Sequence, residues 1–228
     1  MRRRAFLTLL AGAALCPAEE PVFVPLFPED GEPRGWRVRN WADVKNDPQQ
    51  PSPWLVKDGV LHGSEPRGTW LVSEREYGDF KLEFEFLLGE RGNSGLGLRF
   101  PPAGDPAFDG IELQMVDPRY YPSDYSFDPA ELTGGLYKAL PPRAQLYKPN
   151  EWNRYEITCR GALIKVMLNR KLIQDVDLTK ETRAVERGLP LAQRPRRGHL
   201  GFQELSRGGA HVQIRGARIK ELTTSEAN

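Results

Sequence analysis

Hydrophobic and polar residues alternate with a period of two along much of the chain. Phe80, Leu82, Phe84 and Phe86, for example, are separated by the charged residues Lys81, Glu83 and Glu85. The same alternation recurs in residues 96–100, 111–115, 155–159 and 164–168, and in shorter form in 200–202 and 212–214. Successive side chains of a β-strand point to opposite faces of its sheet, so each segment predicts a strand with one buried face.

Glycine-containing polar turns separate these segments, at residues 57–59, 90–93, 160–161 and 207–209. The chain has 22 glycines and 20 prolines among its 228 residues, a content of turn formers that disfavours a helical bundle. No repeat of 20–50 residues is present. Many short strands joined by turns predict an all-β sandwich.

Two longer stretches interrupt the pattern. Residues 117–133 contain Tyr120, Tyr121, Tyr125 and Phe127, which indicates an ordered lid or rim, and residues 178–197 are rich in charge with room for a short helical turn. No change of composition divides residues 19–228, which we interpret as one domain.

Residues 1–18 have the layout of an export signal. Three arginines are followed by an apolar run that is too short to span a membrane, and small residues then lead to Ala18. Arg3-Arg4 resembles a twin-arginine signal. We therefore expect a periplasmic or extracellular protein without a membrane span. A lipid anchor at Cys16 is disfavoured because the bulky Leu15 precedes it.

Charge and metal-binding residues exclude some function classes. The formal net charge of +1 gives no broad basic surface for nucleic acid. Cys159 is the one cysteine left after residue 18 and is expected to be inert core. The spacing of His62, His199 and His211 gives no reason to predict a zinc site.

The polar positions of the middle strands are the first candidates for chemistry. If the alternation holds, six of them point away from the core: Glu83, Glu85, Arg99, Glu112, Gln114 and Gln203. Carboxylates beside an arginine and amides could perform acid–base chemistry on a sugar. The same composition is also normal for the solvated face of an antiparallel sheet. The pattern alone leaves both interpretations open.

Ordered motifs over residues 22–222 resemble the 3-keto-disaccharide hydrolase domain family. They are Leu26-Phe27 with Gly35-Trp36, the segments 54–61 and 70–86, Gly92-Asn93-Ser94-Gly95 leading to Leu98-Arg99, and the segments 110–115, 133–137, 151–153, 168–169 and 198–203. Each motif is weak, but the ordered set is specific. The resemblance implies a concanavalin A-like jelly-roll sandwich and an exported, carbohydrate-active protein.

The resemblance also implies a substrate and a mechanism. In the family, a glycoside already oxidised at C3 loses its C2 proton to a base, the C1–O bond breaks by β-elimination, and water then adds. By this analogy Glu112 is the candidate acid or base. The candidate residues for binding the small carbohydrate substrate are Asn93, Arg99, Gln114, Tyr137, Trp152, Asn153 and Gln203. A divalent metal could polarise the ketone, but the sequence does not indicate its ligands.

The chain departs from the family at its C-terminal motif. Where the family commonly has Gln-x-His-Gly, Gln203 is followed here by Glu204, Leu205 and Ser206. Glu204 could take the role of the missing histidine, His62 or His199 could reach the site, or the activity could be lost. Two alternatives therefore remain: a non-catalytic, lectin-like carbohydrate-binding module, and a glucanase, for which no Glu-x-Asp-x-x-Glu pattern is present. The sequence does not indicate the oligomeric state.

Overall fold

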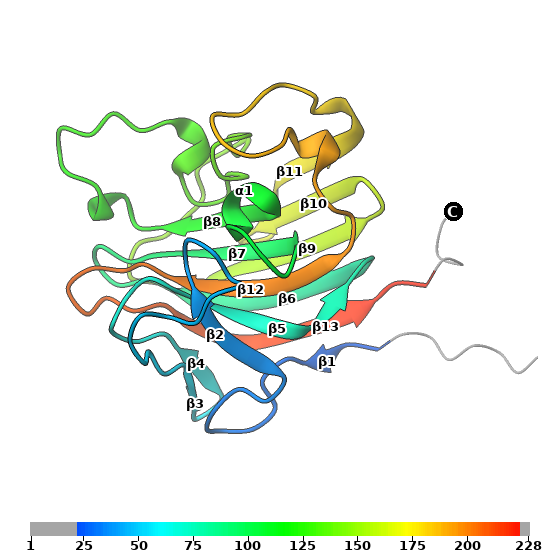
Figure 1. The fold of residues 1–228 in the computed structure, drawn as a ribbon. Coiled ribbons are helices and arrows are strands. Elements are labelled where there is room, and N and C mark those ends of the chain that lie inside the picture. Colours follow the sequence, from blue (N-terminus) through cyan, green and yellow to red (C-terminus); the bar gives the residue numbers. More distant parts are fainter. Residues whose placement is uncertain (1–21, 224–228) are drawn as a thin grey trace, which may run out of the picture.

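Two antiparallel β-sheets face each other in the computed structural model, which describes residues 22–223 (Figure 1). The predicted export signal, residues 1–18 with Cys16, lies outside the described residues. No helix in the described part of the chain is long and apolar enough to cross a membrane.

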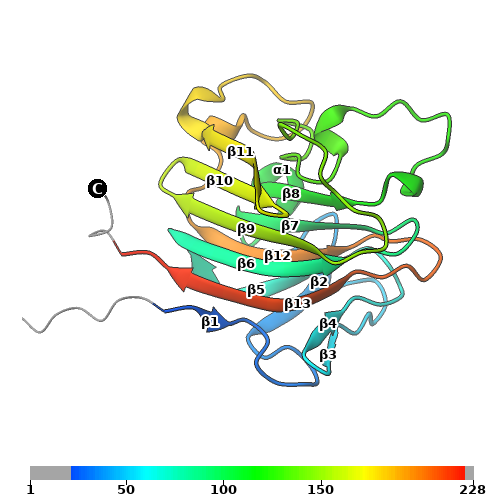
Figure 2. The same cartoon turned by 180° about the vertical axis from the view of Figure 1, so that it is seen from behind.

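The larger sheet has eight strands and faces the viewer in Figure 2. Its order is β11-β10-β9-β6-β13-β4-β3, with β1 paired to β13. The strands are β1 (Val24–Pro25), β3 (Leu55–Lys57), β4 (Val60–His62), β6 (Phe80–Leu87), β9 (Asn153–Arg160), β10 (Leu163–Leu168), β11 (Lys171–Asp177) and β13 (Gln213–Glu221).

The smaller sheet has five strands in the order β2-β5-β12-β7-β8. They are β2 (Trp36–Asn40), β5 (Thr69–Tyr77), β7 (Asn93–Phe100), β8 (Ile111–Val116) and β12 (Gly198–Glu204). The helical pieces are short: α1 (Pro106–Asp109), η1 (Pro118–Tyr120), η2 (Pro129–Glu131), η3 (Leu178–Lys180) and η4 (Leu191–Gln193). The turns η3 and η4 occupy the stretch 178–197, as predicted, and α1 lies in front of β8 in Figure 1.

The core lies between the sheets and is built from the alternating hydrophobic residues. Phe84 of β6 packs edge-on against Phe202 of β12, with 5.3 Å between ring centroids, and against Tyr155 of β9 at 5.7 Å. Cys159 is fully buried there, as expected. Full burial of a phenylalanine such as Phe84 stabilises the fold by roughly 1.5–3 kcal/mol. The predicted all-β sandwich is confirmed.

Two of the six polar positions, Glu83 and Glu85, point away from the core as predicted but not on the face of Glu112, Gln114 and Gln203. Glu83 and Glu85 lie on β6 of the larger sheet, on the side away from the core. Glu83 pairs with Arg154 and Arg218, both at 2.7 Å, and Glu85 pairs with Arg215 at 2.7 Å. This is the solvated face that an antiparallel sheet normally has.

Candidate functional site

The outer face of the smaller sheet, turned away from the core, carries the polar residues of interest. Leu96, Leu98 and Leu113 point into the core, so the residues between them on β7 and β8 point outward. Five such positions are Asn93, Gly95 and Gly97 on β7 and Glu112 and Gln114 on β8. The register pairs Gly95 with Gln114 and Gly97 with Glu112.

Gly95 lies between two glutamines. It pairs with Gln114 on one side. On the other side Leu96 pairs with Phe202, so Gln203 is the next residue along β12 and stands beside Gly95. A β-carbon on Gly95 would lie only 1.8 Å from Oε1 of Glu112. The carboxyl of Glu112 therefore lies over Gly95, in the row that also contains Gln203 and Gln114.

Glu112 is buried and incompletely paired. The residue is 2% exposed, and its Oε1 has no hydrogen-bond partner among the described residues. Burial, and to a lesser extent the negative charge of Asp105, raise the pKa of Glu112 well above its usual value. The side chain therefore holds a proton at pH values where an ordinary glutamate is ionised, and can donate it. Oδ1 of the buried Asn93 likewise has no partner in the described chain.

Tyr137 lies beside Glu112 because the segment 133–137 extends the smaller sheet at its β8 edge. Its backbone N–H donates to the carbonyl of Glu112 at 2.9 Å, and the N–H of Gly134 donates to that of Gln114 at 3.0 Å. Leu136 points into the core, so Tyr137 points outward, next to Glu112. Burial, and next the charge of Glu112, raise the pKa of the Tyr137 hydroxyl. This hydroxyl is therefore a hydrogen-bond donor to the site.

The tyrosine-rich segment is ordered, as predicted. Tyr121 and Tyr125 stack with 4.6 Å between ring centroids, and Phe127 packs edge-on against Tyr121 at 4.9 Å. The Tyr125 hydroxyl donates to the buried Glu131 at 3.0 Å, and Glu131 also pairs with Lys138 at 2.7 Å. These contacts join the segment to Lys138, which follows Tyr137, so the aromatic cluster forms a rim near Glu112.

Asp105 is a buried carboxyl whose charge acts on Glu112, and sequence reasoning did not single it out. Its side chain caps α1 by accepting the N–H of Ala107 at 3.1 Å, and it pairs with Arg187 at 3.2 Å. Burial raises the pKa of Asp105 to about 6, against the opposing effect of the Ala107 hydrogen bond. The Asp105-Pro106 pair is a recognisable start of a helix, but nothing in the sequence indicates that this helix lies over β8.

The prediction that Arg99 lies on the outer face is wrong. Arg99 has a backbone φ of 53°, in the left-handed region, which reverses the alternation near the end of β7. Phe100 consequently packs on the outer face against Trp70, and the fully buried Arg99 points to the inner side. Its guanidinium donates to the carbonyls of Gly78 at 2.8 Å and Gly161 at 2.6 Å and pairs with Asp79. Arg99 therefore joins β7 to the β5–β6 connection and to the β9–β10 turn.

The expectation that Glu204 acts beside Glu112 is also wrong. Glu204 directly follows Gln203 in β12, so its side chain points to the opposite face. It is fully buried and accepts the backbone N–H groups of Ser206 at 2.7 Å and Val212 at 2.9 Å, with Nδ1 of His211 3.5 Å away. Glu204 therefore holds the turn between β12 and β13.

Asn153 begins β9 of the larger sheet and Trp152 directly precedes it, and neither lines the outer face of the smaller sheet. Arg215 lies 4.1 Å over the ring of Trp152, on the face where Arg215 pairs with Glu85. The amide of Asn153 bonds to the backbone of Lys148 and Glu151 and to Asn169. Both were expected to bind substrate, but Trp152 packs against Arg215 of β13 and Asn153 stabilises the loop before β9.

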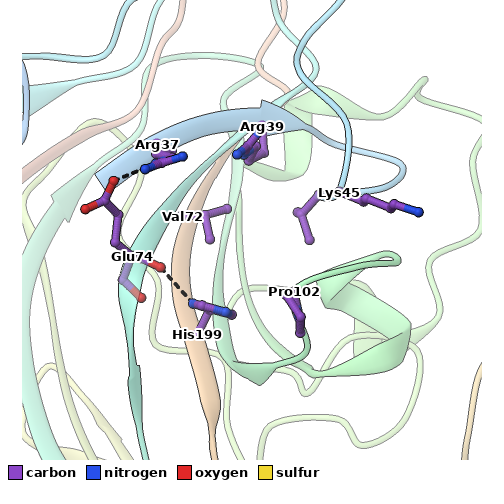
Figure 3. A pocket seen from close by; sticks show the side chains of 9 residues that line it. Arg37, Arg39, Lys45, Val72, Glu74, Pro102 and His199 are labelled. Carbon is purple, nitrogen blue, oxygen red and sulfur yellow. Dashed lines mark hydrogen bonds and ion pairs between the residues drawn. The ribbon is translucent and has the colours of Figure 1, made fainter. Parts of the chain in front are cut away.

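An open pocket lies on the same outer face, at its β2 side (Figure 3). We call it the arginine pocket. Its volume is about 350 Å³, and its lining residues are Arg37, Arg39, Val44, Lys45, Val72, Ser73, Glu74, Pro102 and His199. Sequence reasoning missed it because loops 41–47 and 101–105 complete it, joined by the N–H of Val44 donating to Gly104 at 2.9 Å.

The remaining histidines are spread over the fold. His62 ends β4, whereas His211 lies beside Glu204. Within residues 22–223 no group of three or more histidine, cysteine or acidic side chains is arranged to hold a metal ion.

Comparison with known proteins gives a consistent assignment. A candidate glycosyl hydrolase from Parabacteroides distasonis ATCC 8503 shares the fold with a TM-score of 0.72 at 24% identity, covering 88% of this chain and 100% of that one. A second from the same organism gives 0.69 at 22% identity, covering 88% and 94%. A laminarinase from Rhodothermus marinus gives 0.53 at 14% identity, covering 90% and 98%. These likenesses confirm the concanavalin A-like jelly-roll fold. No curated protein is significantly similar to the chain.

The resemblance inferred from the ordered motifs is confirmed over nearly the whole described chain. The sequence profile of the 3-keto-alpha-glucoside-1,2-lyase-like domain matches residues 22–220. The chain therefore belongs to the 3-keto-alpha-glucoside-1,2-lyase-like domain family.

Proposed function

We propose that this chain is an exported enzyme that cleaves the glycosidic bond of 3-keto-glycosides on the outer face of the smaller sheet. The observation that carries the proposal is the state of Glu112. Its carboxyl is buried, its pKa is raised, and its Oε1 lacks a partner in the described chain. A buried acid with an unused oxygen is costly unless a ligand completes it, and such groups cluster at functional sites.

The proposed reaction assigns the acid role to Glu112. A base removes the proton at C2, which the C3 ketone acidifies. The electron pair of that C–H bond forms the enolate, and its collapse to the enone breaks the C1–O bond. Protonated Glu112 gives its proton to the departing oxygen. Water then adds across the double bond, which restores the 3-keto sugar and completes a net hydrolysis.

Asp105 is our candidate for the base. Its charge acts on Glu112, and its pKa of about 6 leaves it ionised at neutral pH. Two carboxyls with different ionisation states are what elimination needs, one to accept a proton and one to donate it. The amides of Gln114, Gln203 and Asn93 and the hydroxyl of Tyr137 would bind sugar hydroxyls and the oxygen that gains charge.

A carbohydrate-binding module is the second candidate, and one observation favours it. Glu112 is 2% exposed, whereas the open arginine pocket lies elsewhere on the face and does not include it. If the residues that cover Glu112 do not move aside, a sugar would bind elsewhere on this face without being cleaved.

Turnover assays separate the two candidates. The chain would be incubated with 3-keto-trehalose and 3-keto-lactose and with both unoxidised parents, with and without EDTA. We expect sugar release from the keto substrates alone. Glu112→Gln should abolish it, and Glu85→Gln, on the opposite sheet, should leave it intact. Binding of sugars without turnover would favour the binding module, and cleavage of the unoxidised parents would overturn the keto-specific mechanism in favour of a conventional glycosidase.

A further inference from the structure

We propose that the arginine pocket binds the negatively charged group, a carboxylate or a sulfate ester, of an acidic sugar. This inference rests on the proposed function for the carbohydrate nature of the ligand and narrows its class. The pocket shares the outer face of the smaller sheet with Glu112, and its residues come from β2, β5, β12 and two loops (Figure 3).

The charges of the lining side chains favour an anion. Arg37, Arg39 and Lys45 are positive, and Glu74 is the one carboxylate among the lining residues. Glu74 pairs with Arg37, its Oε1 lying 2.5 Å from Nε. The ammonium of Lys45 points away from the other labelled lining residues (Figure 3); its charge acts on the carboxyl of Asp43, although no ion pair within 4 Å joins Lys45 to a carboxylate in the described chain. The lining therefore keeps an excess of positive charge.

Arg39 is the lining residue best placed to bind the anion. Its side chain is only 24% exposed, so its direction is fixed by packing, and its carboxylate partner Asp47 is 83% exposed on a loop outside the lining. Exposed ion pairs contribute little to stability, so a ligand carboxylate can replace Asp47 at small cost. The planar guanidinium also matches two oxygens of a carboxylate or sulfate at once.

The rest of the pocket suits a sugar ring. Val44, Val72 and Pro102 provide an apolar wall. Nδ1–H of His199 donates to the carbonyl of Ser73 at 2.8 Å, which leaves Nε2 of the neutral ring to accept a hydrogen bond from a hydroxyl. An apolar wall with a few polar groups, in a volume of about 350 Å³, is typical of small-ligand sites.

The pocket would hold a sugar unit other than the one at Glu112. Val72 pairs with Gly201, Gly201 with Gly97, and Gly97 with Glu112. Three strand spacings separate Val72 from Glu112, which is roughly 14 Å. The ring of Phe100 lies over the two glycines between them, 2.8 Å and 3.1 Å from where their β-carbons would be. Phe100 is itself fully buried, so a ligand reaching both places would be an acidic oligosaccharide that spans the residues covering Phe100.

Direct binding tests the inference without turnover. Methyl β-D-glucuronide, methyl β-D-glucoside 6-sulfate, methyl β-D-glucoside and inorganic phosphate would be titrated into the full chain by calorimetry at low salt. We expect the acidic glycosides to bind about tenfold or more tightly than the neutral glucoside, since one charge-assisted pair contributes that much. The better of the two acidic ligands identifies the anion. The advantage should shrink as salt is added.

Two variants at the same ion pair keep the test independent of folding. Arg39→Gln should lose the preference for the acidic glycosides, and Asp47→Asn should tighten their binding, because it removes the competing carboxylate. A folding defect cannot produce such a gain. Lys57→Gln, an exposed change on β3, should bind as the parent does.

Several outcomes would overturn the inference: equal binding of acidic and neutral glycosides, phosphate binding as tightly as the acidic sugars, or no effect of either variant. These outcomes leave the keto-glycoside assay and its Glu112→Gln control untouched, so the proposed function could still hold. Conversely, Arg39-dependent binding of acidic sugars without turnover of any keto-glycoside would support the pocket and count against the enzyme.

Discussion

The carboxyl of Glu112 occupies the space above Gly95, where a β-carbon would lie 1.8 Å from Oε1. Because Gly95 has no side chain, Glu112 can lean from its own position, opposite Gly97, into the row of Gln203 and Gln114. A real β-carbon never lies this close to an oxygen. The glycine at position 95 thus determines where the carboxyl of Glu112 is located.

Replacing Gly95 by alanine should move this carboxyl. We expect Gly95→Ala to cost about 1–3 kcal/mol of unfolding free energy by overpacking, and to lower kcat for a keto-glycoside far more than it raises KM. Urea denaturation and steady-state kinetics measure the two effects. Gly78→Ala is the matched control, since its β-carbon would lie 3.4 Å from the side chain of Arg197. Unchanged kcat in a folded Gly95→Ala variant would show that chemistry does not depend on the position of Glu112.

The raised pKa of Asp105 predicts how stability depends on pH. Because this pKa is about 6 in the folded protein and 3.8 ordinarily, the folded state retains a proton that the unfolded state releases between these values. The stabilising contribution is complete below pH 3.8 and is lost as pH rises through about 6. The loss is on the order of 1–3 kcal/mol.

Asp105→Asn should remove this part of the pH dependence. Asparagine keeps the cap of α1, so the fold should survive. Urea denaturation at pH 4, 5, 6 and 7 should give a flatter stability profile for the variant, and Asp124→Asn, an exposed change in the tyrosine-rich segment, should follow the parent. Parallel profiles for parent and Asp105→Asn would contradict the assignment.

The sequence was sufficient for the fold because burial repeats with the period of the strand. Phe80, Leu82, Phe84 and Phe86 all lie in the core, as their alternation predicts. For the site, alternation correctly placed Glu112 and Gln114 outward but could not assign Glu83 to a different sheet, since strand pairing is decided by contacts distant in sequence. The family motifs correctly predicted that Tyr137 lies near Glu112, and it does so because the segment 133–137 pairs directly with β8.

The residues that sequence reasoning misplaced or missed owe their positions to single backbone features or to loops. One left-handed residue, Arg99, reverses the face of β7. Glu204 was predicted as a substitute for the histidine of the family's Gln-x-His-Gly motif. Successive side chains of a strand point to opposite faces, so Glu204 does not share the face of Gln203. Asp105 and Arg39 are contacted or surrounded by residues from loops, and hydrophobic periodicity does not predict the path of a loop.

The guanidinium of Arg99 should matter for stability and not for the reaction. It is fully buried and serves two carbonyls and a carboxylate at the edge of the sheets. Lysine cannot reproduce this fork, so Arg99→Lys should cost about 2–4 kcal/mol. The folded fraction should keep the kcat and KM of the parent, measured after correction for active protein. A selective loss of kcat without loss of stability would restore Arg99 to the site.

Glu204 and Glu112 should respond oppositely to the same change. Both oxygens of Glu204 accept backbone N–H groups, at 2.7 Å from Ser206 and 2.9 Å from Val212. Glutamine has one acceptor oxygen, so Glu204→Gln would place its NH₂ group against an N–H donor, at a cost of about 1–3 kcal/mol.

Glu112 has an oxygen without a partner in the described chain, and burial favours its neutral form. Glu112→Gln should therefore retain the stability of the parent near neutral pH and lose turnover, whereas Glu204→Gln should lose stability and retain turnover in its folded fraction. Urea denaturation and keto-glycoside kinetics on both variants measure this crossed pattern. If Glu204→Gln instead abolished turnover at unchanged stability, Glu204 would be the replacement for the family's histidine, and its place on the inner side of β12 would have to change during the reaction.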